Sequence, residues 1–243
     1  MTLEELRAAL DARLVPEARR WLAESLAAVR RDPPQIRLRF PAAGRHLGRG
    51  AVVNHASSDE QVPRWTMDQA GRVLLLAELG DRVVDELDEL YRYGDADEQR
   101  AIVAGLHLLP IGGRGLPLVV EALRSNDARL VAATVGPYGS ARLPDHLFRH
   151  AVLKCVFVGV PLAAVHGLDR RADSELARML AGYALERVAA GRDVPADVWA
   201  VVHRFDPWEE LAAIEAEMKA PRAAPRAAAR RALAALAAER RRS

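Results

Sequence analysis

The sequence predicts an all-α protein of stacked helical hairpins, a HEAT-like α-α superhelix with a long irregular loop near the N-terminus. Apolar residues recur every three or four positions along most of the chain, which is the spacing of one helix face. The apolar segments are short, and Gly, Pro or capping residues separate them. Short helices joined by tight turns are typical of helical-repeat proteins, although the chain contains no exact sequence repeat.

The N-terminal residues predict two helices followed by the loop. Thr2 and Glu5 have the spacing of a capping box, so a first helix is expected to run to about Leu14. Pro16 suits the first position of a second helix, which a pair of prolines ends. Residues 32–65 contain Pro, Gly and His without a sustained period, and we therefore expect an irregular loop there.

The middle of the chain predicts a series of short helices. A second capping-box pattern, from Thr66 to Gln69, opens a helix that Gly94 closes. Asp95 is placed to cap the next helix, and short apolar segments continue as far as the Gly-Pro pair at residues 136–137. These segments supply the predicted hairpins.

The most apolar stretch of the chain is AVLKCVFVGVPLAAV, residues 151–165. Lys154 is its only charge, so we expect a buried helix enclosed by protein on nearly every side. Asp145 is expected to be its N-cap, Pro161 to interrupt it and Gly167 to end it. The stretch is shorter than the roughly 20 apolar residues of a membrane span, and we expect no transmembrane segment. Cys155, the single cysteine, is expected to be a structural thiol in a reducing compartment.

Three more helices are predicted after this stretch. Asp173 caps one that Gly191 ends, Pro195 begins another, and Asp206 precedes a third. The spacing of the apolar residues in each of them is helical, so the C-terminal third completes an all-α chain.

We assign residues 1–219 to a single helical-repeat domain and residues 220–243 to a basic Ala/Arg-rich tail, helical or flexible. The tail has few large side chains to bury, so we expect it to be solvated or partner-dependent. From Lys219 onward the net charge is +7, and because the whole chain carries +2, the preceding residues carry −5. This acidic body argues against nucleic-acid binding, whereas the tail permits peripheral contact with a membrane. The N-terminus lacks the pattern of a secretory signal, so we expect a cytoplasmic protein.

Lys154 is the first candidate for chemistry. A desolvated lysine can serve as a base or a Schiff-base nucleophile, but it can equally form a structural ion pair or extend to the surface. His146 and His150 share a helix face, as paired metal ligands do. No third ligand is marked by the sequence, so we predict no metal site and no cofactor.

The turn after the apolar stretch concentrates charge in Asp169, Arg170 and Arg171. It is either a solvated turn or a clamp for an anion built from two guanidinium groups. On the following helix, Arg187 lies on the same apolar stripe as Tyr183 and therefore needs a carboxylate or a ligand anion as its partner.

Residues 153–205 contain a series of short elements in a fixed order. They are Leu153-Lys154, Phe157-x-Gly159, Gly167-Leu168-x-Arg170-Arg171-Ala172, Glu175-Leu176-Ala177, Tyr183-Ala184-x-Glu186-Arg187, Ala190-Gly191-Arg192 and Pro195-x-x-x-Trp199. In the order and spacing of these elements, the segment resembles the EboA family of bacterial metabolite-traffic proteins. Two departures are Gly136, where the family commonly has Asn in an Asn-Pro-Tyr turn, and Asp173, where it has Asn. The basic tail after Lys219 has no counterpart in the resemblance.

The resemblance implies a non-enzymatic helical-repeat binding or adaptor protein that helps a secondary metabolite or its precursor reach the cell envelope. It implies partner proteins from the same gene cluster and no catalytic residues. The alternatives are a protein–protein scaffold of a biosynthetic cluster and an enzyme that uses Lys154. The patch predicted to bind a polar or anionic metabolite, or a partner's acidic segment, consists of Lys154, Asp169, Arg170, Arg171, Arg178, Tyr183, Glu186, Arg187 and Arg192.

Overall fold

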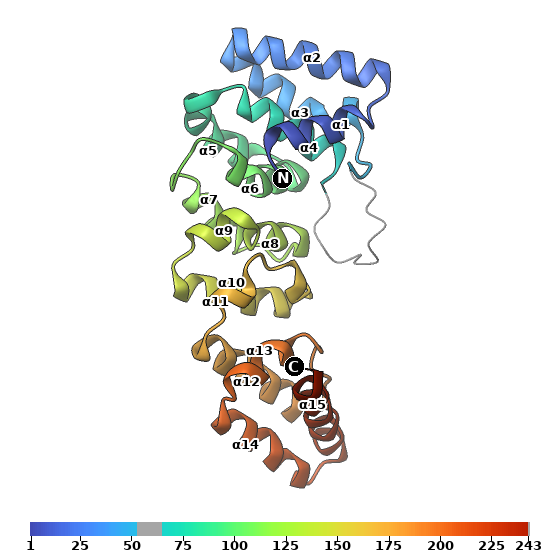
Figure 1. The fold of residues 1–243 in the computed structure, drawn as a ribbon, viewed down its shortest axis with the longest axis vertical. Coiled ribbons are helices and arrows are strands. Elements are labelled where there is room, and N and C mark those ends of the chain that lie inside the picture. Colours follow the sequence, from blue (N-terminus) through green and yellow to red (C-terminus); the bar gives the residue numbers. More distant parts are fainter. Residues whose placement is uncertain (53–64, 243) are drawn as a thin grey trace. The chain divides into compact units, whose positions relative to one another are not determined.

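The computed structural model describes residues 1–52 and 65–242. These residues form helices joined by short turns, and the one β-type pairing among them is an isolated bridge between Ala51 and Thr66. The prediction of an all-α protein is therefore confirmed (Figure 1). The HEAT-like superhelix stays a prediction.

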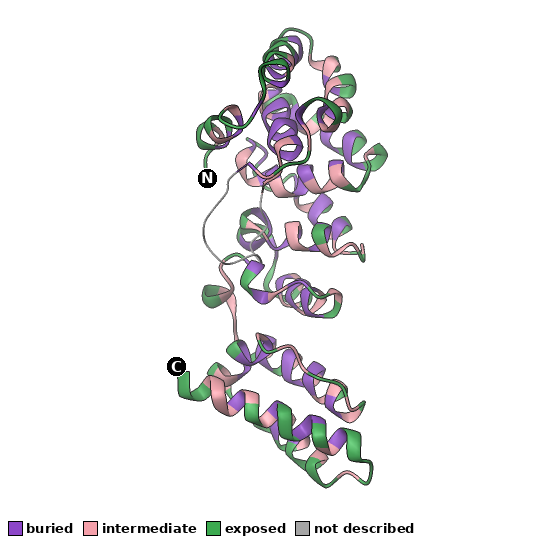
Figure 2. Cartoon of the chain, turned by 90° about the vertical axis from the view of Figure 1, so that its right-hand side faces the viewer, coloured by how far each residue is buried: buried purple, intermediate pink, exposed green. Residues whose placement is uncertain are grey.

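The chain divides into two compact units, Met1–Leu143 and Pro144–Ser243. Each unit has its own buried apolar residues, and buried residues of all types are purple in Figure 2. The single domain over residues 1–219 stays a prediction.

In the first unit, successive helices pack against near neighbours: α3 against α4, α4 against α6, and α6 against α8. The capping boxes predicted at Thr2, Thr66 and Asp95 are all present. The helices are α1 (Leu3–Asp11), α2 (Pro16–Arg31), α3 (Ile36–Leu47), α4 (Met67–Ala77), α5 (Val83–Tyr93), α6 (Ala96–Gly105), α7 (Leu116–Ala122), α8 (Ala128–Thr134) and α9 (Pro137–Arg142).

The prediction of an irregular loop over residues 32–65 is wrong for the first part of that range, where α3 forms. Ile36, Phe40, Ala43 and Leu47 recur at helical spacing and are all buried, so packing supplies the stability that the local sequence lacks. The proline and glycine within α3 obscure this pattern in the sequence. Residues 53–64 of the expected loop lie outside the described part of the chain.

The second unit is organised around α12, which packs against α13, α14 and α15. Trp199 on α13 is 1% exposed and anchors this core. The helices of the unit are α10 (Asp145–Val158), α11 (Leu168–Arg171), α12 (Ser174–Ala189), α13 (Val198–Phe205), α14 (Trp208–Ala216) and α15 (Ala223–Arg242).

The apolar stretch at residues 151–165 is not one enclosed helix. Helix α10 ends at Val158, because Gly159 adopts the left-handed conformation with φ of 81° and stops the helix. Phe157, in the middle of the stretch, is 60% exposed. Asp145 is the first residue of α10 rather than its N-cap, since Pro144 occupies the cap position.

The basic tail, expected to be helical or flexible, forms helix α15. The expectation that this helix is solvated is wrong. Ala228, Ala229 and Leu236 are buried because small side chains let α15 approach α12 and α13 closely. Two of its arginines fasten it further. Arg231 Nε lies 2.6 Å from an Asp193 carboxylate oxygen, and Arg222 Nη2 donates to the carbonyl of Ala189 at the end of α12.

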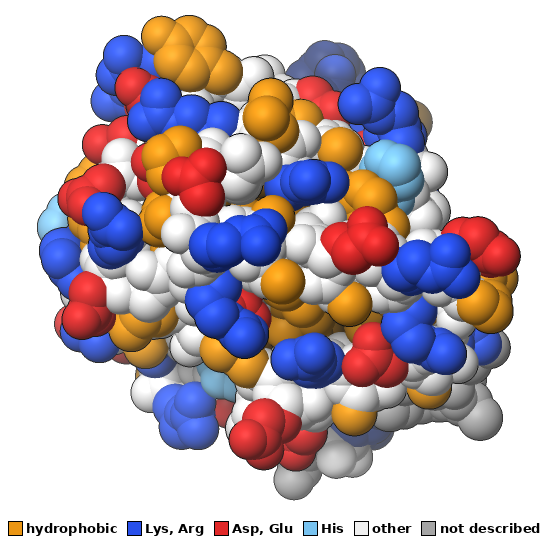
Figure 3. Space-filling model, turned by 90° about the horizontal axis from the view of Figure 1, so that it is seen from above, with side chains coloured by type: hydrophobic (Ala, Val, Ile, Leu, Met, Phe, Trp, Pro, Cys, Tyr) orange, Lys and Arg blue, Asp and Glu red, His pale blue; other side chains and the backbone are white. Residues whose placement is uncertain are grey.

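No helix in the described residues is both long enough and apolar enough to pass through a bilayer. Basic and acidic side chains are interspersed on the face drawn in Figure 3, so that face carries no continuous basic surface. Exposed arginines of the chain also have acidic partners; Arg30 Nε, for example, lies 2.8 Å from a Glu78 carboxylate oxygen.

Candidate functional site

The charged turn at α11 is held by ion pairs within the second unit. Arg204 of α13 contacts Asp169, with 3.2 Å between Nη1 and Oδ1, and also donates to the Asp169 carbonyl. Arg171 contacts Asp145 at 2.7 Å, and its guanidinium lies 4.1 Å from the ring centroid of Phe148. These contacts hold α11 against α10 and α13, so the two charged residues already have partners.

Arg178 lies in a separate ion pair that links α12 to α14. Its Nε and Nη2 donate to the Glu175 carboxylate at 2.9 and 2.8 Å, and its Nη1 lies 3.6 Å from Glu210. The hydrogen bonds from Arg178 lower the pKa of Glu175. The arginine therefore acts as a brace between two helices.

Asp173 caps α12, as predicted, by accepting a hydrogen bond from the Leu176 amide at 2.9 Å. Arg149 of α10, which sequence reasoning did not identify, contacts the same carboxylate at 2.9 Å. Burial alone would raise the pKa of Asp173, but the hydrogen bonds from Arg149 and from Leu176 outweigh it and hold the pKa below its usual value of 3.8.

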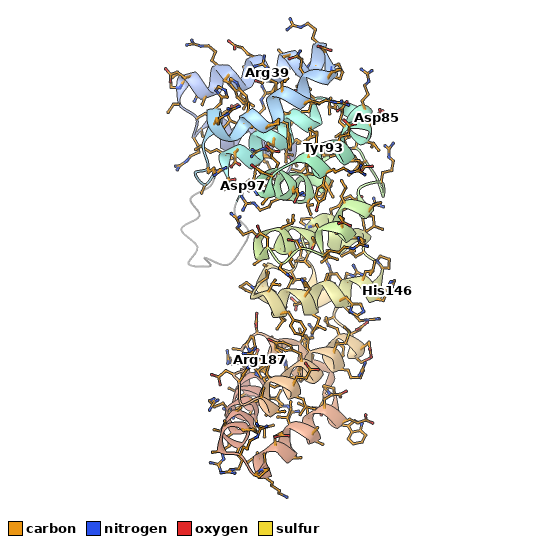
Figure 4. The ribbon with its side chains drawn as sticks, turned by 180° about the vertical axis from the view of Figure 1, so that it is seen from behind. Arg39, Asp85, Tyr93, Asp97, His146 and Arg187 are labelled. Atoms are coloured by element: carbon orange, nitrogen blue, oxygen red, sulfur yellow. The ribbon has the colours of Figure 1, made fainter. Side chains whose placement is uncertain are left out.

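An aromatic and cationic group remains at the surface between α10 and α12. The exposed ring of Phe157 meets Tyr183 edge to face, with 4.9 Å between centroids. Arg187, labelled in Figure 4, places its guanidinium 5.8 Å from the Tyr183 centroid. Half-buried Lys154 lies on the same face of α10 as Phe157, three positions earlier. We refer to Lys154, Phe157, Tyr183 and Arg187 as the aromatic–cation surface.

The partner of Arg187 is a backbone group rather than the expected carboxylate or ligand anion. Its Nε donates to the carbonyl of Asp193, just past the end of α12. Arg170, Glu186 and Arg192 are exposed. The structure thus groups Arg187 with the aromatic rings and places the charged turn and Arg178 in separate contacts.

The remaining candidates for chemistry are placed as follows. Cys155 is fully buried, and this burial raises the pKa of its thiol to about 12. His146 and His150 are exposed on α10. Across residues 1–52 and 65–242, no group of three or more His, Cys, Asp or Glu side chains is placed to hold a metal ion.

The first unit contains a buried ion network that sequence reasoning missed. Arg72 is 1% exposed and contacts Asp68, which is 0% exposed. Its Nε donates to the carbonyl of Phe40 at 3.2 Å, and its Nη2 lies 3.7 Å from Glu98. Arg72 therefore connects α4 to α3 and α6. The signal in the sequence is an Asp and an Arg four residues apart in an otherwise apolar helix.

Beside this network, three arginines meet one carboxylate, that of Asp97. Arg49, Arg100 and Arg129 place a guanidinium nitrogen 3.1, 3.2 and 3.6 Å from its oxygens. We refer to these four residues as the Asp97 arginine cluster. Arg49 and Arg129 are far from Asp97 in the sequence, so no local pattern marks the cluster.

The comparisons with known proteins give one match. The family model described as "Metabolite traffic protein EboA" matches residues 2–203. The match includes α1 to α12 and most of α13, and it ends before the basic tail. Comparison with the curated proteins and with the solved structures gave no match.

Proposed function

Because the chain belongs to the EboA family of metabolite traffic proteins, we propose that it is a non-enzymatic binding or adaptor protein for a secondary metabolite or its precursor. It holds a polar or anionic aromatic molecule on the way to the cell envelope. The binding place is the aromatic–cation surface. The single observation that carries this proposal is the exposed Phe157 ring, which packs against Tyr183 next to Arg187.

The chemistry of this surface suits a ligand with both a ring and a negative charge. An exposed aromatic side chain next to an arginine can stack against a flat ligand while the guanidinium attracts its anionic group. Single exposed apolar residues are common, but aromatic residues and arginine are enriched where proteins bind partners. The Tyr183 ring limits the rotation of Phe157, so little side-chain entropy remains to be lost on binding.

Ion pairs hold other charged residues of the predicted patch in place, which also suits a binding protein. Asp169, Arg171 and Arg178 are engaged in ion pairs that hold helices together, so their removal affects the fold before it affects a ligand. The Cys155 thiol, with its raised pKa, stays protonated at neutral pH and is a poor nucleophile. These features favour binding over catalysis in the second unit.

The test is native mass spectrometry of the full chain purified from its own host. We expect a small molecule to accompany the wild-type protein and to be lost from Phe157→Asp. The matched control is Trp208→Asp, because Trp208 is another exposed aromatic residue of the same unit, 71% exposed, on α14. Circular dichroism establishes that both variants are folded.

Three outcomes would count against the proposal. The wild-type protein could carry no small molecule, or both variants could keep it equally, and either result would remove the aromatic–cation surface as its binding place. A protein subunit that is lost only from Phe157→Asp would instead indicate the scaffold alternative.

A further inference from the structure

The Asp97 arginine cluster collects its members from three places in the first unit. Arg49 follows the end of α3, Asp97 and Arg100 lie on α6, and Arg129 lies on α8. Figure 4 labels Asp97. Its side chain is 15% exposed, and Arg49 and Arg129 are 66% and 61% exposed. Two mostly solvated cations, Arg49 and Arg129, and one sheltered cation, Arg100, at 15% exposed, therefore converge on one sheltered carboxylate.

Positive charge exceeds negative charge in this cluster. Among residues 1–52 and 65–242, the only other carboxylate in contact with it is Asp127, which accepts hydrogen bonds from the side chain and the amide of Arg129. The hydrogen bonds from Arg129 outweigh burial and lower the pKa of Asp127, so this carboxylate is ionised at neutral pH. Within the part of the chain that the structure describes, three guanidinium groups thus face two carboxylates, and one positive charge is left over.

The donors of the cluster are also incompletely used. Arg178 elsewhere in the chain shows the two-pronged contact that a guanidinium makes with a carboxylate, through both Nε and Nη2. Arg100 instead reaches Asp97 through Nη2, and its Nε is enclosed with no hydrogen-bond acceptor among the described residues. An enclosed donor without an acceptor is costly, and an oxyanion at this place would satisfy it.

An aromatic pair lies just past the C-terminal end of α6, where His107 belongs to the 3-10 turn Leu106–Leu108 that follows the helix. Positions 97, 100, 104 and 107 are spaced as one helix face, and the His107 ring lies 6.5 Å from the Trp65 ring, centroid to centroid. Trp65 is joined to the segment that follows Arg49, because its carbonyl accepts from the Val52 amide at 2.8 Å. Seven residues of helix correspond to about 10 Å, so a small molecule can span from the arginines to the rings.

From these contacts we infer that the Asp97 arginine cluster is an anion site. Its ligand is a small molecule with a carboxylate or phosphate group on a flat ring. The anionic group takes the place of Asp97 as the acceptor for Arg49 and Arg100, and the ring lies toward Trp65 and His107. This site uses different residues from the aromatic–cation surface, so its test is independent of the test of the proposed function.

The purified full chain tests this inference with four probes at constant ionic strength: acetate, benzoate, inorganic phosphate and phenyl phosphate. Binding is followed by tryptophan fluorescence, with Trp65→Phe to assign the signal, and by isothermal titration calorimetry. We expect saturable binding of benzoate or phenyl phosphate, at least tenfold tighter than that of the matching ringless anion. The comparison of benzoate with phenyl phosphate identifies the preferred anionic group.

Two variants should change the affinity in opposite directions, and a third serves as the control. Arg100→Met should weaken binding at least tenfold, because it removes the enclosed donor. Asp97→Asn should strengthen binding about threefold or more, because it removes the competing charge. The control Arg124→Met removes an exposed arginine of the same unit, which pairs with Glu121 at the surface, and should leave binding unchanged.

The inference would be overturned by the absence of saturable binding for all four probes at millimolar concentration. Equal affinities for Arg100→Met and Arg124→Met would also overturn it, as would weaker binding by folded Asp97→Asn. Thermal unfolding of each variant shows that it is folded at the assay temperature.

Discussion

Replacement of Arg72 by Met should destabilise the first unit more than any exposed substitution in it. Arg72 is 1% exposed, and its guanidinium contacts Asp68, the carbonyl of Phe40 and Glu98 on three different helices. Methionine replaces the aliphatic part of the arginine side chain but not the guanidinium, so it fills part of the space and leaves Asp68 buried without its cation. The loss is therefore mainly electrostatic and only secondarily a loss of packing.

The expected cost is about 3–5 kcal/mol in the free energy of unfolding, as for the removal of one partner from a buried ion pair. Thr66 limits the loss somewhat, because its hydroxyl still donates to Asp68 at 2.6 Å. The double variant Arg72→Met with Asp68→Asn removes the uncompensated charge and should recover about 1–3 kcal/mol. The control Arg124→Met, at an exposed ion pair, should cost less than about 1 kcal/mol.

The assay is hydrogen exchange of the α4 amides, which reports opening of the first unit without requiring the whole chain to unfold in one step. Urea unfolding followed by circular dichroism gives a second value. A cost below about 1 kcal/mol for Arg72→Met, or no recovery in the double variant, would show that the buried network does not hold α3, α4 and α6 together.

Three other predictions concern the second unit. Gly191→Ala should loosen α15 by about 2 kcal/mol, because Gly191 has φ of 73° and an added methyl group would lie 2.8 Å from an α15 side chain. The rate of proteolysis within α15 measures this destabilisation. In the control Gly112→Ala, where φ is 56° and the added methyl group has open space, we expect only the cost of the left-handed backbone conformation and no change in the protection of α15. The carboxylate of Asp173 has a lowered pKa, so its stabilising contribution is present above pH 3.8 and is lost as the pH falls through its lower folded pKa. Arg149→Gln should therefore lower the midpoint of urea unfolding at pH 6, and the difference from wild type should shrink toward pH 2, whereas a constant difference would contradict the ion pair. Iodoacetamide should modify Cys155 at pH 8 only as fast as the unit opens, because burial raises its pKa to about 12, and a native rate equal to that of a free thiol would refute this.

The local features of the fold were largely predictable because they depend on neighbouring residues. The caps at Thr2, Thr66, Asp95 and Asp173 are formed by side chains that reach amides three residues away, so their spacing in the sequence is sufficient. The interruption of the apolar stretch was expected at Pro161, whereas α10 already ends before Gly159, since the apolar residues on both sides of this glycine hid its role as a cap.

The candidate sites were predictable only in part because they depend on distant residues. The charges at α11 were identified, but their partners, such as Arg204, come from another helix and decide whether they are available to a ligand. The sequence could not indicate that Arg49 and Arg129 both reach Asp97. Contacts between residues far apart in the chain have no fixed spacing, and only the packed structure defines them.

By itself, the sequence determined the all-α class, the capped starts of the main helices and the membership of the family. Each of these follows from residue type at short, regular spacing. The tertiary structure decided that residues 36–47 are helical, that the alanine-rich C-terminal helix is packed, and which charges are paired. The physical reason is that burial and ion pairing depend on what lies opposite a side chain, and for these residues the opposite surface comes from another helix.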